Sequence, residues 1–388
     1  MLDFVYQNPC KIVFGRNAEQ LLGESVKQHG SRVLLHYGGG SIKRNGVYSR
    51  VAGALQTAGI PFYELGGVQP NPRLSLVREG IRFCREKGID FILAVGGGSV
   101  IDSAKAIAAG VRYEGDVWDY FTKGLPAEDA LPVGTVLTIP AAGSEMSPDA
   151  VITNEEGAFK RGMSGSGIIP RFSILNPENC FSLSPYQTAC GASDILAHLM
   201  ERYFTQVDHV DLTDRLLEAA MKTVTAYAPL VLSEPENYDY RAEIMWAGTV
   251  AHNQYLNVGR MGDWASHGIE HELSGIYDIA HGAGLSIVFP AWMRYVYPAG
   301  PQKFVQFAVR VFGVDYAPGE EELIIEEGIR RLEAFYRSLG LPVRLRDAGI
   351  DDARLEEMAG KSMVGCDSLG NFKKLGREDV ANILRLAL

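Results

Sequence analysis

Short apolar runs alternate with amphipathic stretches through the first half of the chain. The apolar runs predict buried strands at residues 11–14, 32–37, 61–65, 90–95, 133–139, 150–153 and 172–175. Apolar residues that recur with a period near 3.6 predict helices from about residue 17 and over residues 46–58, 74–87 and 100–109. Two of the strands end at a glycine run that opens the next helix. Strand, glycine turn and helix in repetition predict a parallel sheet covered by helices.

The pattern changes near residues 176–183, where long stretches of helical period replace the β-branched runs. We expect helices at residues 185–204, 211–232, 240–258, 264–274, 284–296, 301–312, 320–339, 353–359 and 377–388. The sequence therefore predicts an α/β domain over residues 1–180 and an all-α domain over residues 181–388. Residues 113–132 carry glycine, proline and acidic side chains, and we expect them to form a surface excursion.

The composition limits the class of protein. A 388-residue chain with 46% hydrophobic and 22% charged residues is typical of a globular protein with room for two cores. The formal net charge of −10 argues against nucleic acid or an anionic membrane as a partner. No apolar run reaches the ~18 residues of a membrane span, and residues 1–15 do not resemble a secretory signal. The five scattered cysteines fit reduced thiols, so we expect a cytoplasmic protein.

Two strand-to-helix turns have a sequence suited to phosphate. Residues 38–41 and residues 96–99 both read Gly-Gly-Gly-Ser. Glycine lets the backbone approach a phosphate, and the free N–H groups at a helix start favour its negative charge. A tight turn without a ligand is the alternative, and neither turn is the Gly-x-Gly-x-x-Gly fingerprint. Because ligands of open α/β sheets bind at the carboxyl ends of strands, we predict a pyrophosphate site at residues 96–99.

The first turn also bears on the choice of cofactor. Dinucleotide folds that prefer NAD usually place an acidic side chain on the ribose 2′-hydroxyl. Residues 38–44 contain no aspartate or glutamate, but they do contain Ser41, Lys43 and Arg44. A 2′-phosphate would be attracted by the two cations, so we predict a preference for NADP(H) over NAD(H). The alternative is that Lys43 and Arg44 are solvated cations at a helix start.

Three of the eight histidines lie in one short stretch. His267 and His271 are four residues apart and share a helix face, whereas His281 can join them only if the chain turns, for which Ser274-Gly275 is a plausible place. Upstream, Asp194 and His198 are also four residues apart. Asp194, His198, His267 and His281 would form a site for one divalent metal, Fe²⁺ or Zn²⁺. The alternative is that each histidine is a packed or solvated residue.

With these motifs in view, the chain resembles the iron-containing (group III) alcohol dehydrogenases, and within them the butanol dehydrogenase/broad aldehyde reductase branch. The similarity covers essentially the whole chain. Its motifs are Tyr-Gln-Asn-Pro at residues 6–9, Phe14-Gly15, Gly-Gly-Gly-Ser-Val-Ile-Asp-Ser-Ala-Lys at residues 96–105, Thr-Ile-Pro-Ala-Ala-Gly-Ser-Glu at residues 138–145, residues 194–198, and residues 267–281 with the closing His-Gly-x-Gly. Pro148-Asp149 departs from the pattern of related chains and leaves the loop near the nicotinamide undefined.

The resemblance implies a fold and a set of site residues. The fold is a Rossmann-like dinucleotide-binding domain followed by a helical metal-binding domain, an architecture shared with dehydroquinate synthase, with the site in the cleft between the domains. The metal ligands implied are Asp194, His198, His267 and His281, and His271 matches a histidine beside the nicotinamide and substrate. The cofactor contacts implied are Gly38, Gly39, Ser41, Gly97, Gly98, Ser99, Asp102, Thr138 and Lys160. The family also suggests a homodimer that acts on a small alcohol or aldehyde.

The expected chemistry is reversible hydride transfer between an aldehyde and NADPH. The metal would polarise the carbonyl oxygen, and His271 would relay a proton. A packing or orienting role is the alternative for His271. Two other functions remain open on this fold: a dehydroquinate synthase-type lyase or glycerol dehydrogenase-like enzyme, and a non-catalytic binding protein.

Overall fold

The computed structural model of the protein describes all 388 residues and divides into two compact units. The α/β unit consists of Gln7–Leu183 and Glu236–Thr249. The helical unit consists of Met1–Tyr6, Ser184–Pro235 and Val250–Leu388. The predicted fold class, an α/β domain followed by an all-α domain, is confirmed. The predicted division at residue 180 differs from these units, because the first six residues belong to the helical unit and Glu236–Thr249 belongs to the α/β unit.

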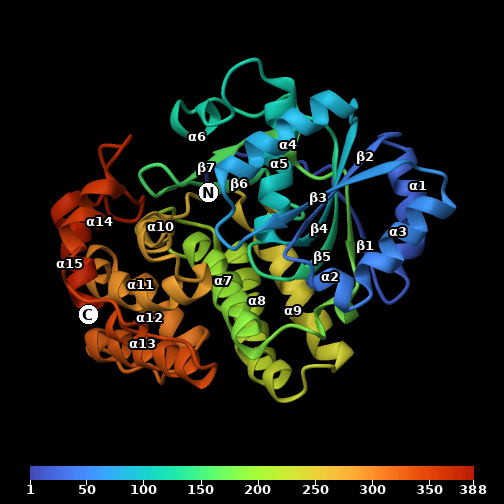
Figure 1. Cartoon of the computed structure of the whole chain (residues 1–388). Helices are drawn as coiled ribbons and strands as arrows, with labels where there is room; N and C mark the ends of the chain where they lie inside the picture. Colours follow the sequence, from blue (N-terminus) through green and yellow to red (C-terminus); the bar gives the residue numbers. More distant parts are fainter. The chain divides into compact units, whose positions relative to one another are not determined.

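A six-stranded parallel sheet forms the centre of the α/β unit (Figure 1). Its strands lie in the order β1-β8-β5-β4-β2-β3, and every neighbouring pair is parallel. The continuous apolar runs predicted these strands because nearly every residue of the central ones is buried. Their bounds are β1 (Lys11–Phe14), β2 (Val33–Gly38), β3 (Phe62–Val68), β4 (Phe91–Gly97), β5 (Val133–Ile139) and β8 (Phe172–Leu175).

Helices cover both faces of this sheet (Figure 1). The helices α4 (Leu74–Lys87) and α5 (Gly98–Arg112) share one hydrophobic cluster with the sheet, and α1 (Leu22–Lys27) and α3 (Val47–Thr57) share the other. The short helix α2 (Ser41–Arg44) follows β2 directly. The structure therefore contains the alternation of strand and helix that the sequence predicts.

Two parts of the α/β unit were not predicted correctly. An antiparallel hairpin joins β6 (Asp149–Asn154) to β7 (Phe159–Ser164), and β7 escaped prediction because its Lys-Arg-Gly segment has no apolar pattern. The surface excursion expected at residues 113–132 contains the short helix α6 (Asp119–Thr122). That expectation is wrong in part, because Val117, Tyr120 and Phe121 are buried in the core.

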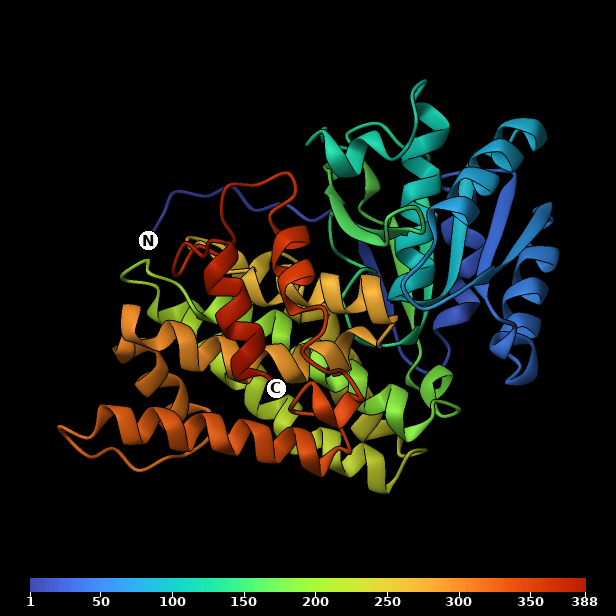
Figure 2. The same ribbon diagram turned by 60° about the vertical axis from the view of Figure 1, so that its left-hand side comes forward.

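Long helices build the helical unit, and α12 and α13 lie side by side in it (Figure 2). Among the predicted helices, the one expected at residues 240–258 stops at Ala251, and the one expected from residue 284 already begins at His281. No helix of the chain combines the length and the apolar character that crossing a membrane would require. The bounds are α7 (Pro185–Tyr203), α8 (Asp211–Ser233), α10 (Ala265–Tyr277), α11 (His281–Val296), α12 (Pro301–Arg310), α13 (Glu321–Ser338), α14 (Leu355–Ser362) and α15 (Arg377–Leu386). The helix α9 (Tyr238–Ala251) belongs to the α/β unit except for its last two residues.

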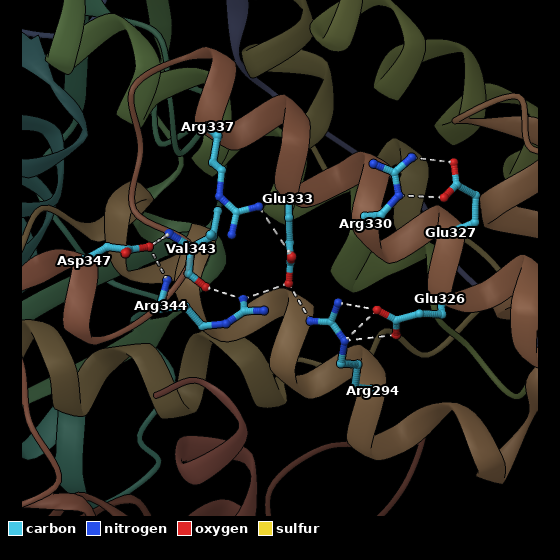
Figure 3. Close-up of polar contacts among 9 residues, drawn as sticks. All are labelled: Arg294, Glu326, Glu327, Arg330, Glu333, Arg337, Val343, Arg344 and Asp347. Carbon is cyan, nitrogen blue, oxygen red and sulfur yellow. Dashed lines mark hydrogen bonds and ion pairs between the residues drawn. The ribbon is translucent and has the colours of Figure 1, made fainter.

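Ion pairs on α13 tie it to its neighbours (Figure 3). The carboxylate of Glu333 bonds Arg294 of α11 and Arg344, and it lies 3.8 Å from Arg337. Arg294 also bonds Glu326, two turns earlier on α13. The network therefore fixes the end of α11, whose first residue is one of the predicted metal ligands.

Candidate metal centre and dinucleotide-binding turns

The helix α7 presents the first two predicted ligands. It begins where the Ser184 side chain accepts a hydrogen bond from the Gln187 N–H, with Pro185 in the first helical position. Asp194 and His198 lie one turn apart near its middle, and both are buried. The distance from His198 Nε2 to Asp194 Oδ1 is 3.5 Å. The spacing of four residues thus places both side chains on one face of the helix.

The other two predicted ligands come from α10 and α11. The chain does turn between His267 and His281, but α10 runs past the predicted turn at Ser274-Gly275 and ends at Tyr277, followed by Asp278 in a left-handed conformation (φ 54°). The imidazole rings of His267 and His281 are 5.3 Å apart, and His281 Nε2 lies 3.8 Å from Asp194 Oδ1. The ligand atoms of Asp194, His267 and His281 all lie within 4.8 Å of one another. His198 adjoins this group, with its ring 4.7 Å from that of His267.

Two buried glutamates hold the outer nitrogens of these histidines. His267 Nδ1 lies 2.8 Å from Glu201 Oε1, and the same carboxylate accepts hydrogen bonds from the backbone N–H groups of His267 and Trp264. His281 Nδ1 bonds Glu270, which also accepts from the Ser274 hydroxyl. A carboxylate on Nδ1 directs the lone pair of Nε2 toward the centre. Neither glutamate was predicted from the sequence.

The glycines of the closing His-Gly-x-Gly motif make room for this arrangement. A Cβ atom on Gly282 would lie 2.0 Å from the carbonyl oxygen of Cys190 on α7, so glycine allows α11 to approach α7 there. The Gly282 carbonyl in turn accepts a hydrogen bond from Ser193. A Cβ on Gly284 would lie 2.5 Å from the Glu270 carboxylate. At both positions a side chain would clash with a neighbour, which explains why the residue is glycine.

The buried groups fit a divalent cation. His267 Nε2 is buried and has no hydrogen-bond partner, a situation that is rare for a polar atom in a folded protein. Burial, together with the neighbouring His252 and His267, keeps the pKa of His198 well below its usual value, so the imidazole is neutral. Neutral imidazoles and an ionised carboxylate are the forms that bind metal.

The two Gly-Gly-Gly-Ser turns lie at the carboxyl ends of adjacent strands. The first follows β2, and its Gly40 has a φ of 89°, which favours glycine. In the second, Gly97 ends β4 and Gly98 begins α5, a long helix whose N-terminal N–H groups point toward the turn. Gly39 has open space around it, whereas a Cβ on Gly97 would meet Ile139 at 2.8 Å. The sheet thus brings together Gly38, Gly39, Ser41, Gly97, Gly98 and Ser99 at one edge, as predicted.

Comparisons with known proteins bear on both halves of this arrangement. Residues 9–177 match the family model described as iron-containing alcohol dehydrogenase, and residues 188–388 match the one described as the C-terminal part of the Fe-containing alcohol dehydrogenase family. The chain belongs to the iron-containing alcohol dehydrogenase family. It is an oxidoreductase of this family, and its relatives depend on either NADH or NADPH.

Three relatives show which branch this alcohol dehydrogenase resembles. It is 49% identical to the probable NADH-dependent butanol dehydrogenase 2 of Bacillus subtilis, over 100% of both chains. It is 36% identical to the NADPH-dependent aldehyde reductase YqhD of Escherichia coli, over 93% of both chains. The crystal structure of NADH-dependent butanol dehydrogenase A from Thermotoga maritima superposes with a TM-score of 0.96 at 44% identity, covering 100% of this chain and 99% of that one. The predicted resemblance to the butanol dehydrogenase/aldehyde reductase branch is confirmed.

Three further residues predicted as cofactor contacts also belong to the α/β unit of this alcohol dehydrogenase. The carboxylate of Asp102, one turn into α5, accepts hydrogen bonds from the Ser144 hydroxyl at 2.5 Å and the Val151 N–H at 2.9 Å. Thr138 is buried near the end of β5, and Lys160 is buried on β7. Asp102 therefore ties the loop after β5 to the helix of the second glycine turn.

His271 lies apart from the main ligand group. Its ring is 5.8 Å from that of His281, and it is half-buried on α10. His271, Glu270 and His281 form a second group whose ligand atoms lie within 4.8 Å of one another. A further buried histidine, His252, was not predicted as part of the site; its ring lies 4.3 Å from that of His198 and is tilted by 41° to it. It follows the end of α9, outside the motifs from which the ligands were predicted.

Proposed function

We propose that this iron-type alcohol dehydrogenase interconverts primary alcohols and aldehydes with NAD(P)H and acts mainly as an aldehyde reductase. The observation that carries the proposal is the group formed by the buried Asp194 and His267 and the half-buried His281. These residues and His198 would hold one divalent ion, Fe²⁺ or Zn²⁺, since both accept carboxylate and imidazole ligands. When bound, the metal supplies Lewis-acid chemistry that polarises the carbonyl oxygen of the aldehyde.

The side chains of the helical unit prepare the ligands for this role. Glu201 and Glu270 occupy Nδ1 of His267 and His281, so each ring keeps its Nε2 lone pair available. Burial keeps the pKa of His198 low, so its imidazole is uncharged, and Asp194 and His267 are buried as well. Asp194 is the one carboxylate of the set and would contribute its negative charge.

The glycine turns support the part of the proposal that concerns dinucleotide binding. Gly97, Gly98 and Ser99 at the start of α5 would hold the pyrophosphate, since backbone N–H groups at a helix start bind anions. Gly38, Gly39 and Ser41 would face the adenosine ribose, because this group is recognised at the end of the neighbouring strand. Asp102, Thr138 and Lys160 remain predicted contacts. His271 would relay the proton that the alkoxide needs.

The preference for NADP(H) stays a prediction. It rests on the absence of an acidic residue at 38–44 and on the two cations there. Among the relatives, the probable butanol dehydrogenase at 49% identity is named NADH-dependent, and the aldehyde reductase at 36% identity is named NADPH-dependent. The ratio of kcat/KM for NADPH to that for NADH decides the matter: a ratio above one supports the prediction, and a ratio below one contradicts it.

We also propose that the enzyme is a cytoplasmic homodimer whose partners are small alcohols and aldehydes, with neither nucleic acid nor membrane among them. The support is the family relationship and the net charge of −10. Light scattering of the purified protein measures the assembly, and a mass of one chain would contradict the dimer.

Metal content and turnover together test the proposed function. Purified under anaerobic conditions, the enzyme should contain about one Fe²⁺ or Zn²⁺ per chain and should oxidise NADPH or NADH steadily in the presence of butanal. Steady consumption separates this reaction from that of a dehydroquinate synthase-type lyase.

The variants His267→Ala and His281→Ala should lose most of the metal and nearly all activity while remaining folded. His209→Ala, which changes an exposed histidine of the same unit, is the matched control and should retain both. Full turnover by metal-stripped protein would contradict the proposal.

A further inference from the structure

A cluster of charged and aromatic side chains adjoins the first glycine turn. Lys43 lies on α2, two residues after Ser41, and its ammonium donates a hydrogen bond to Glu64 of β3 at 2.9 Å. The same carboxylate accepts hydrogen bonds from the hydroxyls of Tyr37 at 2.8 Å and Tyr48 at 2.5 Å. The ammonium also lies 4.9 Å and 4.7 Å from the centres of these two rings. Glu64 is thus the centre of the cluster.

The topology explains how a carboxylate arrives at this place. β3 pairs with β2 in parallel, so that Leu35 lies opposite Glu64, and Tyr37 follows on the same face of β2. Tyr37 directly precedes Gly38, the first residue of the turn. The sequence from residue 38 to residue 44 contains no acidic residue, but the neighbouring strand brings one to its side.

This cluster lies where a dinucleotide fold distinguishes its cofactors. β2 is adjacent to β4, whose glycine turn opens α5. When the pyrophosphate binds at one strand-to-helix turn, the end of the adjacent strand faces the adenosine ribose and its 2′ substituent. A 2′-phosphate carries negative charge, so the net charge around Gly38–Ser41 affects the binding of NADPH and leaves the binding of NADH largely unaffected.

The net charge beside the first glycine turn is less positive than the sequence of residues 38–44 indicates. Lys43 and Arg44 together supply two positive charges beside the turn, but Glu64 offsets that of Lys43. The side chains of both partners are partly exposed, at 46% and 33%, so the pair adds little to stability, while its charges still act on a ligand nearby. Arg44 is exposed and takes part in no ion pair.

We propose that Glu64 is a specificity-determining residue, which neutralises Lys43 and disfavours a 2′-phosphate. The proposal rests on the proposed function, because it assumes that the dinucleotide ribose lies at the first glycine turn. Glu64 then acts against the attraction of Lys43 and Arg44, and the ratio of NADPH to NADH use depends on this one carboxylate.

Two substitutions of opposite sign test the proposal. Glu64→Gln keeps the shape of the side chain and an acceptor for the tyrosine hydroxyls but removes the charge. It should raise the ratio of kcat/KM for NADPH to that for NADH by about three- to tenfold at low ionic strength. Lys43→Met leaves Glu64 unopposed and should lower the same ratio by a similar factor. Both shifts should shrink in 1 M salt, where charges more than ~3 Å apart are screened.

A matched control separates this effect from a general change of surface charge. Glu86→Gln removes a carboxylate that pairs with Lys87 at 2.7 Å on α4, and it should leave the cofactor ratio unchanged. An unchanged ratio in Glu64→Gln, with circular dichroism like that of the parent, would overturn the proposal. If Glu64→Gln does not fold, Lys43→Met alone decides, and an unchanged or raised ratio in that variant would overturn it.

Binding measured without an aldehyde keeps this test apart from that of the proposed function. Dissociation constants for NADP⁺ and NAD⁺ can be determined by titration of each variant. If the protein fails to reduce aldehydes but Glu64→Gln still shifts the ratio of the two constants toward NADP⁺, the proposed function fails and the role of Glu64 stands. If aldehyde reduction is normal and neither ratio moves, the role of Glu64 fails and the proposed function stands.

Discussion

Individual side chains in the helical unit fix where protons and charge lie before any ligand binds. Glu201 holds His267 by its ring and its backbone N–H, and it also accepts the N–H of Trp264, which has a left-handed conformation (φ 69°). The carboxylate therefore sets both the start of α10 and the orientation of a ligand on it. Such outer partners commonly change metal affinity by 10–100-fold when they are replaced.

Substitution of His271 distinguishes between a proton relay and a packing role for this residue. If it relays a proton, His271→Gln should lower kcat by about 10²–10⁴-fold, since this is the usual contribution of a positioned acid–base group. Metal content and the dissociation constant for the dinucleotide should stay as in the parent. A loss of metal would instead identify His271 as a ligand through its group with Glu270 and His281. A normal kcat would remove it from the catalytic residues.

His36 should make the stability of the α/β unit depend on pH. Its ring is buried between Leu65 O and the Ser103 hydroxyl, and burial lowers its pKa from the ordinary 6.5 to about 4. Between these two values the unfolded chain binds a proton that the folded chain does not, so stability falls as the pH falls from about 6.5 toward 4. The full loss is on the order of 3 kcal/mol. Urea titrations at several pH values should show this decline, and His36→Gln should reduce it; an equal decline in both proteins would contradict the assignment.

At the scale of elements, close approach between helices depends on particular glycines. α11 can pack on α7 because Gly282 has no side chain, and this contact sets His281 against Asp194. Glycine inside a helix ordinarily lowers its stability by about 0.5–1 kcal/mol relative to alanine. The packing of the two helices therefore outweighs the helix propensity of residue 282.

A pair of alanine substitutions tests this balance. Gly282→Ala would place a methyl group against the backbone of Cys190, and because backbone cannot move aside, we expect a loss of about 2 kcal/mol or more in the free energy of unfolding. Gly53→Ala, in the middle of α3 with no atom within 4 Å of the added carbon, should instead gain about 0.5–1 kcal/mol. Chemical denaturation measures both. Equal effects of the two changes would show that space at residue 282 is not the reason for its glycine.

Elements and the grouping of candidate ligands could be predicted from the sequence where a local pattern determines them. The apolar runs and their glycine turns identified the strands of the sheet, and the i, i+4 spacing identified Asp194 with His198. The hairpin strand β7 and the end of α10 could not be read, because paired backbone and a left-handed Asp278 determine them. Glu201 and Glu64 carry no local signal, since their partners are 66 and 21 residues away.

At the scale of the whole molecule, each of the two units carries one half of the predicted chemistry. Asp194, His198, His267 and His281 all belong to the helical unit, and the glycine turns belong to the α/β unit. Anything that binds the folded state alone stabilises it by mass action, so a bound metal should stabilise the unit that holds its ligands.

Removal of the metal should therefore loosen one unit selectively. After chelation, amide hydrogen exchange should accelerate in α7, α10 and α11, because their packing is linked through the ligands. Exchange in β2, β4 and β5 should stay as before. Hydrogen–deuterium exchange measured by mass spectrometry resolves these peptides. Uniform acceleration through both units, or none in the three helices, would contradict the assigned ligands.

The α/β unit is not continuous along the chain, and this has a consequence for its synthesis. Its last piece, Glu236–Thr249, supplies Met245 to the core, a hydrogen bond from Thr249 to Glu145 and the ring of Tyr238 beneath Arg16. The ribosome makes this piece only after α7 and α8. All six strands of the sheet precede this piece, but the packing of the α/β unit is complete only after part of the other unit has been made. A polypeptide released at residue 183 would lack this piece and would leave the Glu145 carboxylate without its Thr249 donor.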